Sequence, residues 1–228
     1  MEKKQYDLCI EVLRRLDKAG ILKDVVLIGS WCIPFYKDYF RSTNYSLSLR
    51  TRDVDFLVPS TTKFKRKIDL SKLFEDLGFV VGFKGEEGYI ILEHPDLAIE
   101  FLVPEKGRGS NKPFDLPHLG VNAQQLRYLQ VLSQDIIKVK REGLVVKLPH
   151  PALFALHKLI VAQVRKNKDK GEKDKEEALR TLRAILEKDG PRVILRYFQL
   201  IIPAWRKKII KSLQSAEETE FLNILKIE

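Results

Sequence analysis

Two carboxylates stand two residues apart in DVDFLV, a stretch from Asp53 to Val58 that is otherwise apolar. Side chains alternate between the two faces of a β-strand, so Asp53 and Asp55 are expected on one face, with Val54 and Phe56 on the other. Two like charges side by side repel unless water or a cation screens them. The stretch is therefore predicted to be a strand whose apolar face enters a core. Its acidic face either meets solvent, which is the commoner case for such a pair alone, or holds a metal ion.

The segment before this strand favours the metal interpretation. The apolar run at 24–28 predicts a buried strand, and the pair Gly29–Ser30 then leads into a helix predicted over 30–40. A helix N-terminus offers free N–H groups and a positive dipole end to a phosphate, and glycine lets the backbone approach a ligand closely. The alternative is an ordinary strand-to-helix turn with Ser30 as its N-cap. Pro34 removes an early helical hydrogen bond, so the helix is expected to begin later or with a distorted turn.

A third carboxylate, Glu100, lies in the middle of the apolar segment LAIEFLV. Its neighbours Ile99 and Phe101 are expected to face the opposite side of a strand. A lone carboxylate in an apolar strand is costly unless something pairs with it, and a metal cluster would supply that partner. Mg²⁺ prefers oxygen ligands and often takes carboxylates together with substrate phosphates. Asp53, Asp55 and Glu100 are therefore predicted to form a carboxylate cluster for two-metal phosphoryl-transfer chemistry.

The remaining sequence predicts an α/β (α+β) half followed by a helical part. The turns and periodicities predict a helix over 2–19 and another over 68–77, strands over 79–83, 89–93 and 97–103, a loop over 107–117, a hairpin of 136–139 with 144–148, and helices over 151–166, 173–188, 192–200, 204–213 and 217–227. We expect two domains, 1–149 and 150–228.

Bulk composition is that of an ordinary folded protein. The chain has 228 residues, of which 44% are apolar and 32% charged, enough for one large domain or two small ones. It contains no apolar run long enough to span a membrane, and its charged N-terminal segment lacks the apolar core of a signal peptide. Two cysteines, Cys9 and Cys32, have no metal-ligand spacing. A cytoplasmic protein that does not associate with membranes is expected.

The net charge of +10 favours polyanionic ligands. From Lys138 to Lys175 the chain has eleven Lys or Arg against four Asp or Glu. The run Arg165–Lys175 is expected to be a flexible connection between helices that could also bind an RNA backbone. The alternative is a solvated, lysine-rich surface of a heat-adapted protein, and charge alone does not choose between them.

Several single side chains are candidates for nucleotide contact. Lys158 and Arg165 are seven residues apart and share one face of the first C-terminal helix, where they would either bind phosphate or reach solvent. His157 lies near the apolar stripe of that helix, which favours a buried, hydrogen-bonded histidine over a catalytic base. Arg50 and Arg52 flank the acidic strand and either balance its charge or touch the triphosphate.

The order of LIGSW, RTRDVDFLV and IEFLVP resembles the signature of the polymerase-β-type nucleotidyltransferase superfamily. That signature is a Gly–Ser turn, an Asp–x–Asp strand and a third carboxylate on a later strand. A narrower resemblance, to a group of uncharacterised prokaryotic nucleotidyltransferases, rests on VNAQQLRYLQVL, VKLPHPALFALHKLIVA and KDKEEA. The similarity runs from about residue 25 to 186.

The resemblance implies a fold and a set of roles. The fold would be a small mixed sheet flanked by helices and followed by a helical C-terminal domain. Gly29 and Ser30 would hold triphosphate, Asp53 and Asp55 would hold the metals, and Glu100 would bridge metal and activate the acceptor hydroxyl. The third position is more usually Asp, and Glu is one methylene longer. Lys173 matches the family pattern and joins the other predicted nucleotide-binding cations, Arg52, Lys158 and Arg165.

The implied enzyme is a nucleotidyltransferase dependent on Mg²⁺ or Mn²⁺. It would transfer a nucleoside monophosphate from an NTP, such as ATP, to a hydroxyl of an RNA end, a protein or a small molecule. The alternative is a non-catalytic protein of the same fold that binds nucleic acid or a partner protein, as in a toxin–antitoxin-like system. If the enzyme interpretation is right, the three carboxylates should converge beside the Gly29 turn.

Overall fold

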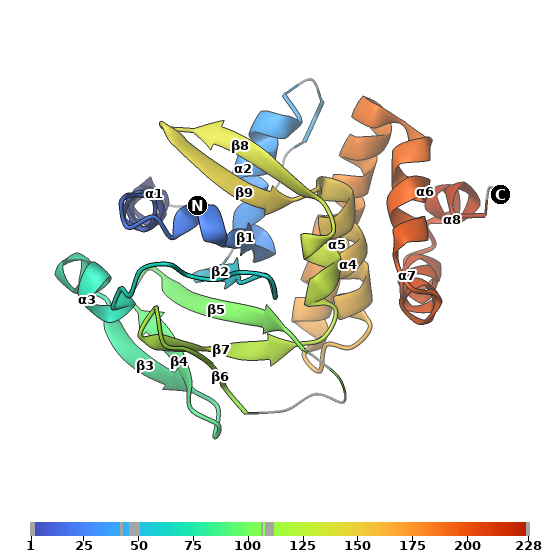
Figure 1. Ribbon diagram of the computed structural model, residues 1–228. Helices are drawn as coiled ribbons and strands as arrows, with labels where there is room; N and C mark the ends of the chain where they lie inside the picture. The colour runs from blue at the N-terminus through green and yellow to red at the C-terminus, as the bar shows by residue number, and fades with distance from the viewer. Residues whose placement is uncertain (1–2, 42, 46–50, 106, 108–111, 227–228) are drawn as a thin grey trace. The chain divides into compact units, whose positions relative to one another are not determined.

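The computed structural model describes residues 3–41, 43–45, 51–105, 107 and 112–226. The chain divides into two compact units (Figure 1). The first consists of Met1–Phe35 and Ser48–Leu148, and the second of Tyr36–Leu47 and Pro149–Glu228. Within the described ranges, no helix is both long enough and apolar enough to cross a bilayer.

In its described residues, the first unit is built on a seven-stranded mixed sheet (Figure 1). Five strands follow the order β1-β2-β5-β4-β3; β7 pairs with β5, and β6 pairs with β7. The pairs β2–β5 and β5–β7 are parallel and the others are antiparallel. The strands are β1 Val26–Ile28, β2 Asp53–Leu57, β3 Val80–Lys84, β4 Tyr89–Glu93, β5 Ala98–Pro104, β6 Phe114–Leu116 and β7 Val121–Leu126. The predicted mixed sheet is confirmed.

The pairing of β2 with β5 forms the centre of this sheet. Every residue of β5 is buried, and Phe56 lies opposite Phe101 in the register. Their rings stack with centroids 5.6 Å apart, an arrangement that adds to the apolar burial of both rings. Val54 is buried on the same face as Phe56, as the alternating sequence predicted.

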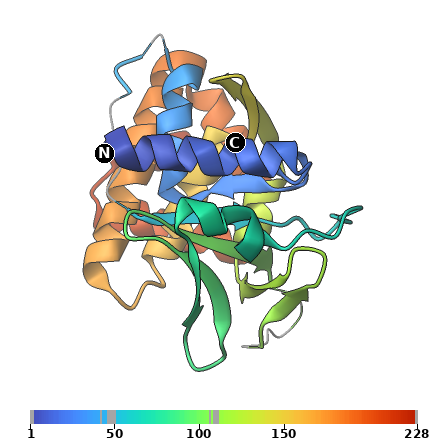
Figure 2. The ribbon, with the colours of Figure 1, turned by 90° about the vertical axis from the view of Figure 1, so that its left-hand side faces the viewer.

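Helices and short turns complete the first unit. They are α1 Lys3–Lys18, η1 Leu22–Asp24, η2 Gly29–Trp31, α3 Leu70–Phe74, η3 Glu75–Leu77 and η4 Leu129–Ser133. The apolar stripe of α1, including Val12, Leu13 and Leu16, is buried. Figure 2 shows α1 running along the unit. Arg15 ties α1 to the α3 region, because its guanidinium donates to the Leu73 carbonyl at 3.0 Å and to the Asp76 carboxylate.

A separate hairpin, β8 Ile136–Arg141 and β9 Leu144–Pro149, forms where the sequence predicted one. Its two loop residues, Glu142 and Gly143, both have positive φ, at 49° and 78°. This conformation is the type I′ turn that matches the twist of a two-residue hairpin.

The second unit is helical, as predicted. It contains α4 Pro151–Ala162, α5 Lys168–Asp189, α6 Pro191–Leu200, α7 Pro203–Ser215 and α8 Thr219–Ile224, together with the end of α2 Cys32–Tyr39. Proline opens α4, α6 and α7, where its missing N–H costs nothing. Almost all of α4 is buried, and it packs against α5, α6 and α7. Tyr36 packs on Phe154 and donates its hydroxyl to the Pro149 carbonyl.

The helix predicted over 30–40 begins at Cys32 after a 3₁₀ turn, which agrees with the expectation that Pro34 delays or distorts its start. Pro34 falls in the first helical turn, where no backbone donor is lost. Two other local expectations need correction. The expected connection 165–175 is mostly helical, because the Asn167 side chain accepts from the Lys170 N–H and caps α5. The expected loop 107–117 contains β6, which finds a partner in β7.

We expect Phe56→Ala to lower the free energy of unfolding by roughly 3–5 kcal/mol, because it opens a cavity in the centre of the sheet. Phe83→Ala is the matched control: Phe83 is 71% exposed, whereas Phe56 is fully buried. The control should change stability by no more than about 0.5 kcal/mol. Urea denaturation followed by circular dichroism measures both. Equal losses would contradict the description of this core.

Candidate functional site

The strand register brings two of the three predicted carboxylates side by side. Asp55 lies opposite Glu100 of β5 and, on its other side, opposite Ile28 at the end of β1. Partners in adjacent strands share a face of the sheet, and Asp53 shares it by alternation. Asp53 is exposed, Asp55 is half-buried and Glu100 is buried. The acidic face is therefore partly open to solvent at its Asp53 end.

The turn after β1 is built around Asp55. Gly29 has a φ of +68°, a conformation that residues with a Cβ rarely adopt. A Cβ on Gly29 would lie 2.5 Å from Asp55 Oδ2, well inside contact distance. Both the backbone angle and the close approach of Asp55 require glycine here, and phosphate binding by this turn stays a prediction.

Ser30 and Trp31 complete the 3₁₀ turn η2. The Cys32 N–H donates to the carbonyls of Gly29 and Ser30, and no side chain caps the turn. Ser30 is therefore not the N-cap of a regular helix; its side chain is buried. Trp31 is fully buried, which favours core packing, yet its indole Nε1 has no hydrogen-bond partner among the described residues.

Glu100 is neutralised by a residue that the sequence did not single out. Lys84 Nζ lies 2.6 Å from one carboxylate oxygen of Glu100 and 2.9 Å from the other. The lysine comes from the edge strand β3, and its side chain is 52% exposed, against 9% for Glu100. A paired ammonium explains how a carboxylate can be buried here. Sequence could reveal this partner only with the strand order known, because β4 lies between β3 and β5.

The chemistry of the acidic face suits a hard divalent cation. Its donors are carboxylate oxygens, which Mg²⁺ and Mn²⁺ prefer, and Gly29 leaves the space beside Asp55 Oδ2 free of a Cβ. Within the ranges that the structure describes, no three His, Cys, Asp or Glu side chains stand together in an arrangement that could hold a metal. The metal-binding role of Asp53, Asp55 and Glu100 stays a prediction.

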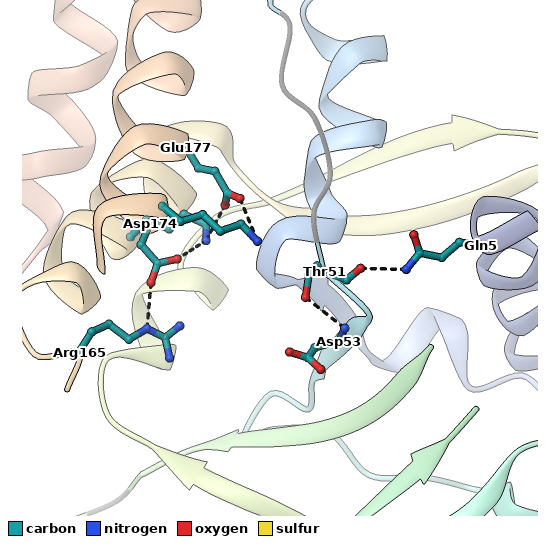
Figure 3. Close-up of polar contacts among 8 residues, drawn as sticks. Gln5, Thr51, Asp53, Arg165, Asp174 and Glu177 are labelled. Carbon is teal, nitrogen blue, oxygen red and sulfur yellow. Dashed lines mark hydrogen bonds and ion pairs between the residues drawn. The ribbon is translucent and has the colours of Figure 1, made fainter. Parts of the chain in front are cut away.

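The start of β2 is fixed by a short chain of hydrogen bonds. The Asp53 N–H donates to Thr51 Oγ1 at 3.2 Å, and Gln5 on α1 donates to the Thr51 carbonyl at 3.1 Å (Figure 3). Arg52 donates to the His94 carbonyl at 2.7 Å, so part of its guanidinium is already engaged. Arg50 lies outside the described residues.

In the helical unit, the predicted cation Lys158 is buried rather than open to solvent. Its Nζ lies 2.6 Å from Asp174 Oδ1 and 2.8 Å from Glu177 Oε2, both on α5. Arg165 Nε lies 2.9 Å from Asp174 Oδ2, and Lys173 lies 3.7 Å from Glu177 (Figure 3). Lys158 thus contacts both carboxylates, whereas Arg165 contacts Asp174 and Lys173 contacts Glu177. Nucleotide binding by these three cations stays a prediction.

Burial and the neighbouring charges have opposite effects on the pKa values of Lys158 and Asp174. Burial alone would lower the pKa of Lys158, but Asp174 and Glu177 outweigh it and raise that pKa above its ordinary value. Burial alone would raise the pKa of Asp174, but Lys158 and Arg165 outweigh it and lower that pKa. The network is therefore charged on both sides at neutral pH.

His157 is not suited to act as a base on a solvent-exposed substrate. Burial, together with the positive charge of the neighbouring Lys158, lowers its pKa to about 3. It is therefore neutral at physiological pH. Its Nε2 is buried and has no hydrogen-bond partner in the described part of the chain.

The spacing of Asp174 and Glu177 in the sequence could have predicted that they are buried. Asp174 and Glu177 continue, at helical spacing, the buried stripe of α5 that includes Ala178, Leu182 and Ile185. Acidic residues on an apolar stripe imply a buried cationic partner. The segment KDKEEA drew attention to Lys173, whereas the buried member next to it is Asp174.

The family model described as Nucleotidyltransferase matches residues 7–200 of the chain. A search of the curated proteins finds no match. The solution structure of the antibiotic-resistance factor ANT(2″)-Ia is similar at 14% identity, with a TM-score of 0.50 over 96% of this chain and 98% of that one. The crystal structure of ANT(2″)-Ia in complex with adenylyl-2″-tobramycin is similar at 13% identity, with a TM-score of 0.51 over 86% and 97% of the two chains. At such identities the likeness concerns the fold.

Gly29→Ala is expected to displace the Asp55 carboxylate, because the added Cβ would meet Asp55 Oδ2. We expect Mn²⁺ affinity, measured by electron paramagnetic resonance, to fall by roughly 10-fold or more. Gly88→Ala is the control: it has a similar φ of +72° and nothing within 4 Å of an added Cβ. Both variants should lose about 1–2 kcal/mol of stability from the backbone angle, and only Gly29→Ala should lose Mn²⁺. Equal Mn²⁺ binding by both would contradict the site.

Lys158→Met is expected to cost roughly 3–5 kcal/mol of stability at pH 7, because it leaves Asp174 and Glu177 without their buried partner. Lys175→Met removes an ion pair with Glu172, whose side chain is 72% exposed, and should cost no more than about 1 kcal/mol. The folded-state pKa of Asp174 is lowered, so its contribution exists above the unfolded pKa and disappears as pH falls through the folded one. Urea titrations should therefore show the Lys158→Met deficit narrowing below about pH 4. A deficit independent of pH would contradict the charged network.

Proposed function

Because the chain belongs to the nucleotidyltransferase family, we propose that it transfers a nucleoside monophosphate from an NTP to a hydroxyl acceptor at the Asp53–Asp55–Glu100 face. The observation that carries this proposal is the register of β1, β2 and β5, which sets the Gly29 turn and Glu100 on either side of Asp55. Mg²⁺ or Mn²⁺ held by the three carboxylates would neutralise phosphate charge and orient the triphosphate.

The chain's own residues would bind the triphosphate and accept the proton of the acceptor hydroxyl. The missing Cβ of Gly29 lets the Asp55 carboxylate pack against the turn, and Gly29, Ser30 and Arg52 are the candidates to contact the triphosphate. The acceptor oxygen forms a bond to the α-phosphorus, and the bond from that phosphorus to the bridging oxygen breaks. Pyrophosphate leaves with the electron pair, and Glu100 receives the hydroxyl proton. The protein thus contributes mainly position and charge.

The acceptor class is open among an RNA end, a protein and a small molecule. The net charge of +10 supports a polyanion such as RNA. The likeness of fold to ANT(2″)-Ia, which was crystallised with adenylyl-2″-tobramycin, supports a small-molecule hydroxyl.

A second candidate function is a non-catalytic binding protein of the same fold. The ion pair between Lys84 and both oxygens of Glu100 favours it, because a lysine already neutralises the third carboxylate without a metal.

The test is transfer of label from each α-labelled NTP, with Mg²⁺, to total RNA, to protein extract or to aminoglycosides. We expect Asp53→Asn to lower transfer by roughly 100-fold or more, since loss of a metal ligand removes several kcal/mol of transition-state stabilisation. Asp17→Asn, an exposed carboxylate on α1, removes the same charge and should leave the rate unchanged.

Two results would count against the enzyme. One is transfer that persists undiminished in Asp53→Asn. The other is a wild-type protein that binds neither Mn²⁺ nor any NTP, which would favour the non-catalytic candidate.

A further inference from the structure

A cleft of ≈410 Å³ opens in the first unit, where the chain leaves β2 and β5. We call it the aromatic cleft and define it by six of its lining residues: Val58, Phe64, Val103, Phe114, Leu116 and His118. Its volume lies within the range of about 300–1,000 Å³ typical of small-ligand sites. Phe114 is 46% exposed and His118 is also exposed, so rings are accessible at its mouth.

The aromatic cleft is separate from the acidic face. The Val58 N–H donates to the Leu102 carbonyl at 2.9 Å, so the β2 register continues to this residue. By alternation, Val58 and Val103 lie on the face opposite to Asp55 and Glu100. The cleft is also at the far end of β2 from Asp53. Changes in the cleft therefore leave the predicted metal ligands untouched.

A run of unpaired cations borders the aromatic cleft. Lys63, which lines the cleft, is followed by Lys65, Arg66 and Lys67. All four are exposed, and none makes an ion pair or side-chain hydrogen bond with another described residue. No acidic residue occurs from 58 to 68. We call these four residues the basic run.

The acidic residues that flank the basic run or the cleft-lining segments in the sequence do not neutralise the basic run. Asp69 accepts hydrogen bonds from Ser71 and Lys72 as the N-cap of α3, and Glu105 pairs with Arg127. Asp115 alternates with Phe114 and Leu116 on β6, so its side chain faces away from the cleft that those two residues line. The positive charge beside the cleft is therefore available to an external anion.

We propose that the aromatic cleft and the basic run together bind single-stranded RNA. Phe64, Phe114 and His118 offer ring faces on which unpaired bases can stack, and the basic run offers cations for the phosphates. Duplexes do not fit this chemistry, because their bases are already stacked on each other. Ser60 and Gln125 also line the cleft. Gln125 Nε2 donates to the Lys112 carbonyl at 3.0 Å, so the Ser60 hydroxyl and the Gln125 side-chain oxygen are the groups offered to ribose 2′-hydroxyls. The proposal concerns binding and does not depend on nucleotidyl transfer.

The direct test is fluorescence anisotropy with a 5′-fluorescein-labelled 12-nucleotide RNA of mixed sequence. We expect Phe114→Ala to weaken binding by about 5- to 100-fold, the range for loss of one stacked base. Phe83→Ala, an exposed phenylalanine on β3 outside the cleft, should leave affinity unchanged.

Charge is tested with a second pair of variants. Affinity falls as salt rises, so the plot of log affinity against log salt has a negative slope. The triple variant Lys65→Gln, Arg66→Gln, Lys67→Gln should make that slope less steep by about 2. The control triple Lys207→Gln, Lys208→Gln, Lys211→Gln removes equal charge from α7 and should keep most of the slope. Circular dichroism verifies that each variant is folded.

Several results would overturn the proposal. One is that the two triple variants weaken RNA binding equally. Another is that neither Phe114→Ala nor the basic-run triple changes the affinity for RNA. A third is that the protein binds DNA or duplex RNA of the same sequence as tightly as single-stranded RNA. Labelled RNA can also be competed with unlabelled RNA or with a 12-residue poly-glutamate. If both competitors displace it at the same concentration, the ligand of the cleft would be an acidic polypeptide instead. Asp53→Asn should bind RNA as the wild type does, so failure of transfer and failure of binding are separable.

Discussion

The parallel pairing of β2 with β5 is the constraint on which the first unit depends. One register serves both faces of the sheet: it stacks Phe56 on Phe101 in the core and sets Asp55 beside Glu100 on the other side. A shift of one residue would exchange the two faces and bury the acidic pair. The apolar packing therefore fixes the position of the carboxylates, and the chemistry of the acidic face follows from the stability of the core.

Among the residues that the structure describes, buried charge is compensated in two separate places. In the sheet unit, Lys84 supplies the counter-charge for Glu100 from an exposed edge strand. In the helical unit, Lys158 is shared by Asp174 and Glu177 between α4 and α5. The Lys84 side chain is half-exposed, whereas Lys158 is buried and links α4 to α5. The first ion pair therefore stays in contact with solvent, and the second is enclosed between two helices.

Much of this arrangement could be predicted from the sequence because it depends on local patterns. Alternation in DVDFLV identified β2 and its two faces, and the glycine at position 29 marked a turn that tolerates no Cβ. What could not be predicted depends on long-range pairing. Lys84 reaches Glu100 across the intervening strand β4, and the sequence alone does not give this strand order. The segment around β6 looked like a loop because a three-residue strand is visible only through its partner β7.

Asp53 and Asp55 are proposed to hold the metal ion that serves a bound nucleotide. Crystals grown with Mn²⁺ and a non-hydrolysable ATP analogue, measured at the manganese edge for anomalous scattering, test it most directly. The account predicts an anomalous peak about 2.1 Å from carboxylate oxygens of both Asp53 and Asp55, with the triphosphate beside Gly29. A bound analogue whose manganese lies away from both aspartates would contradict it.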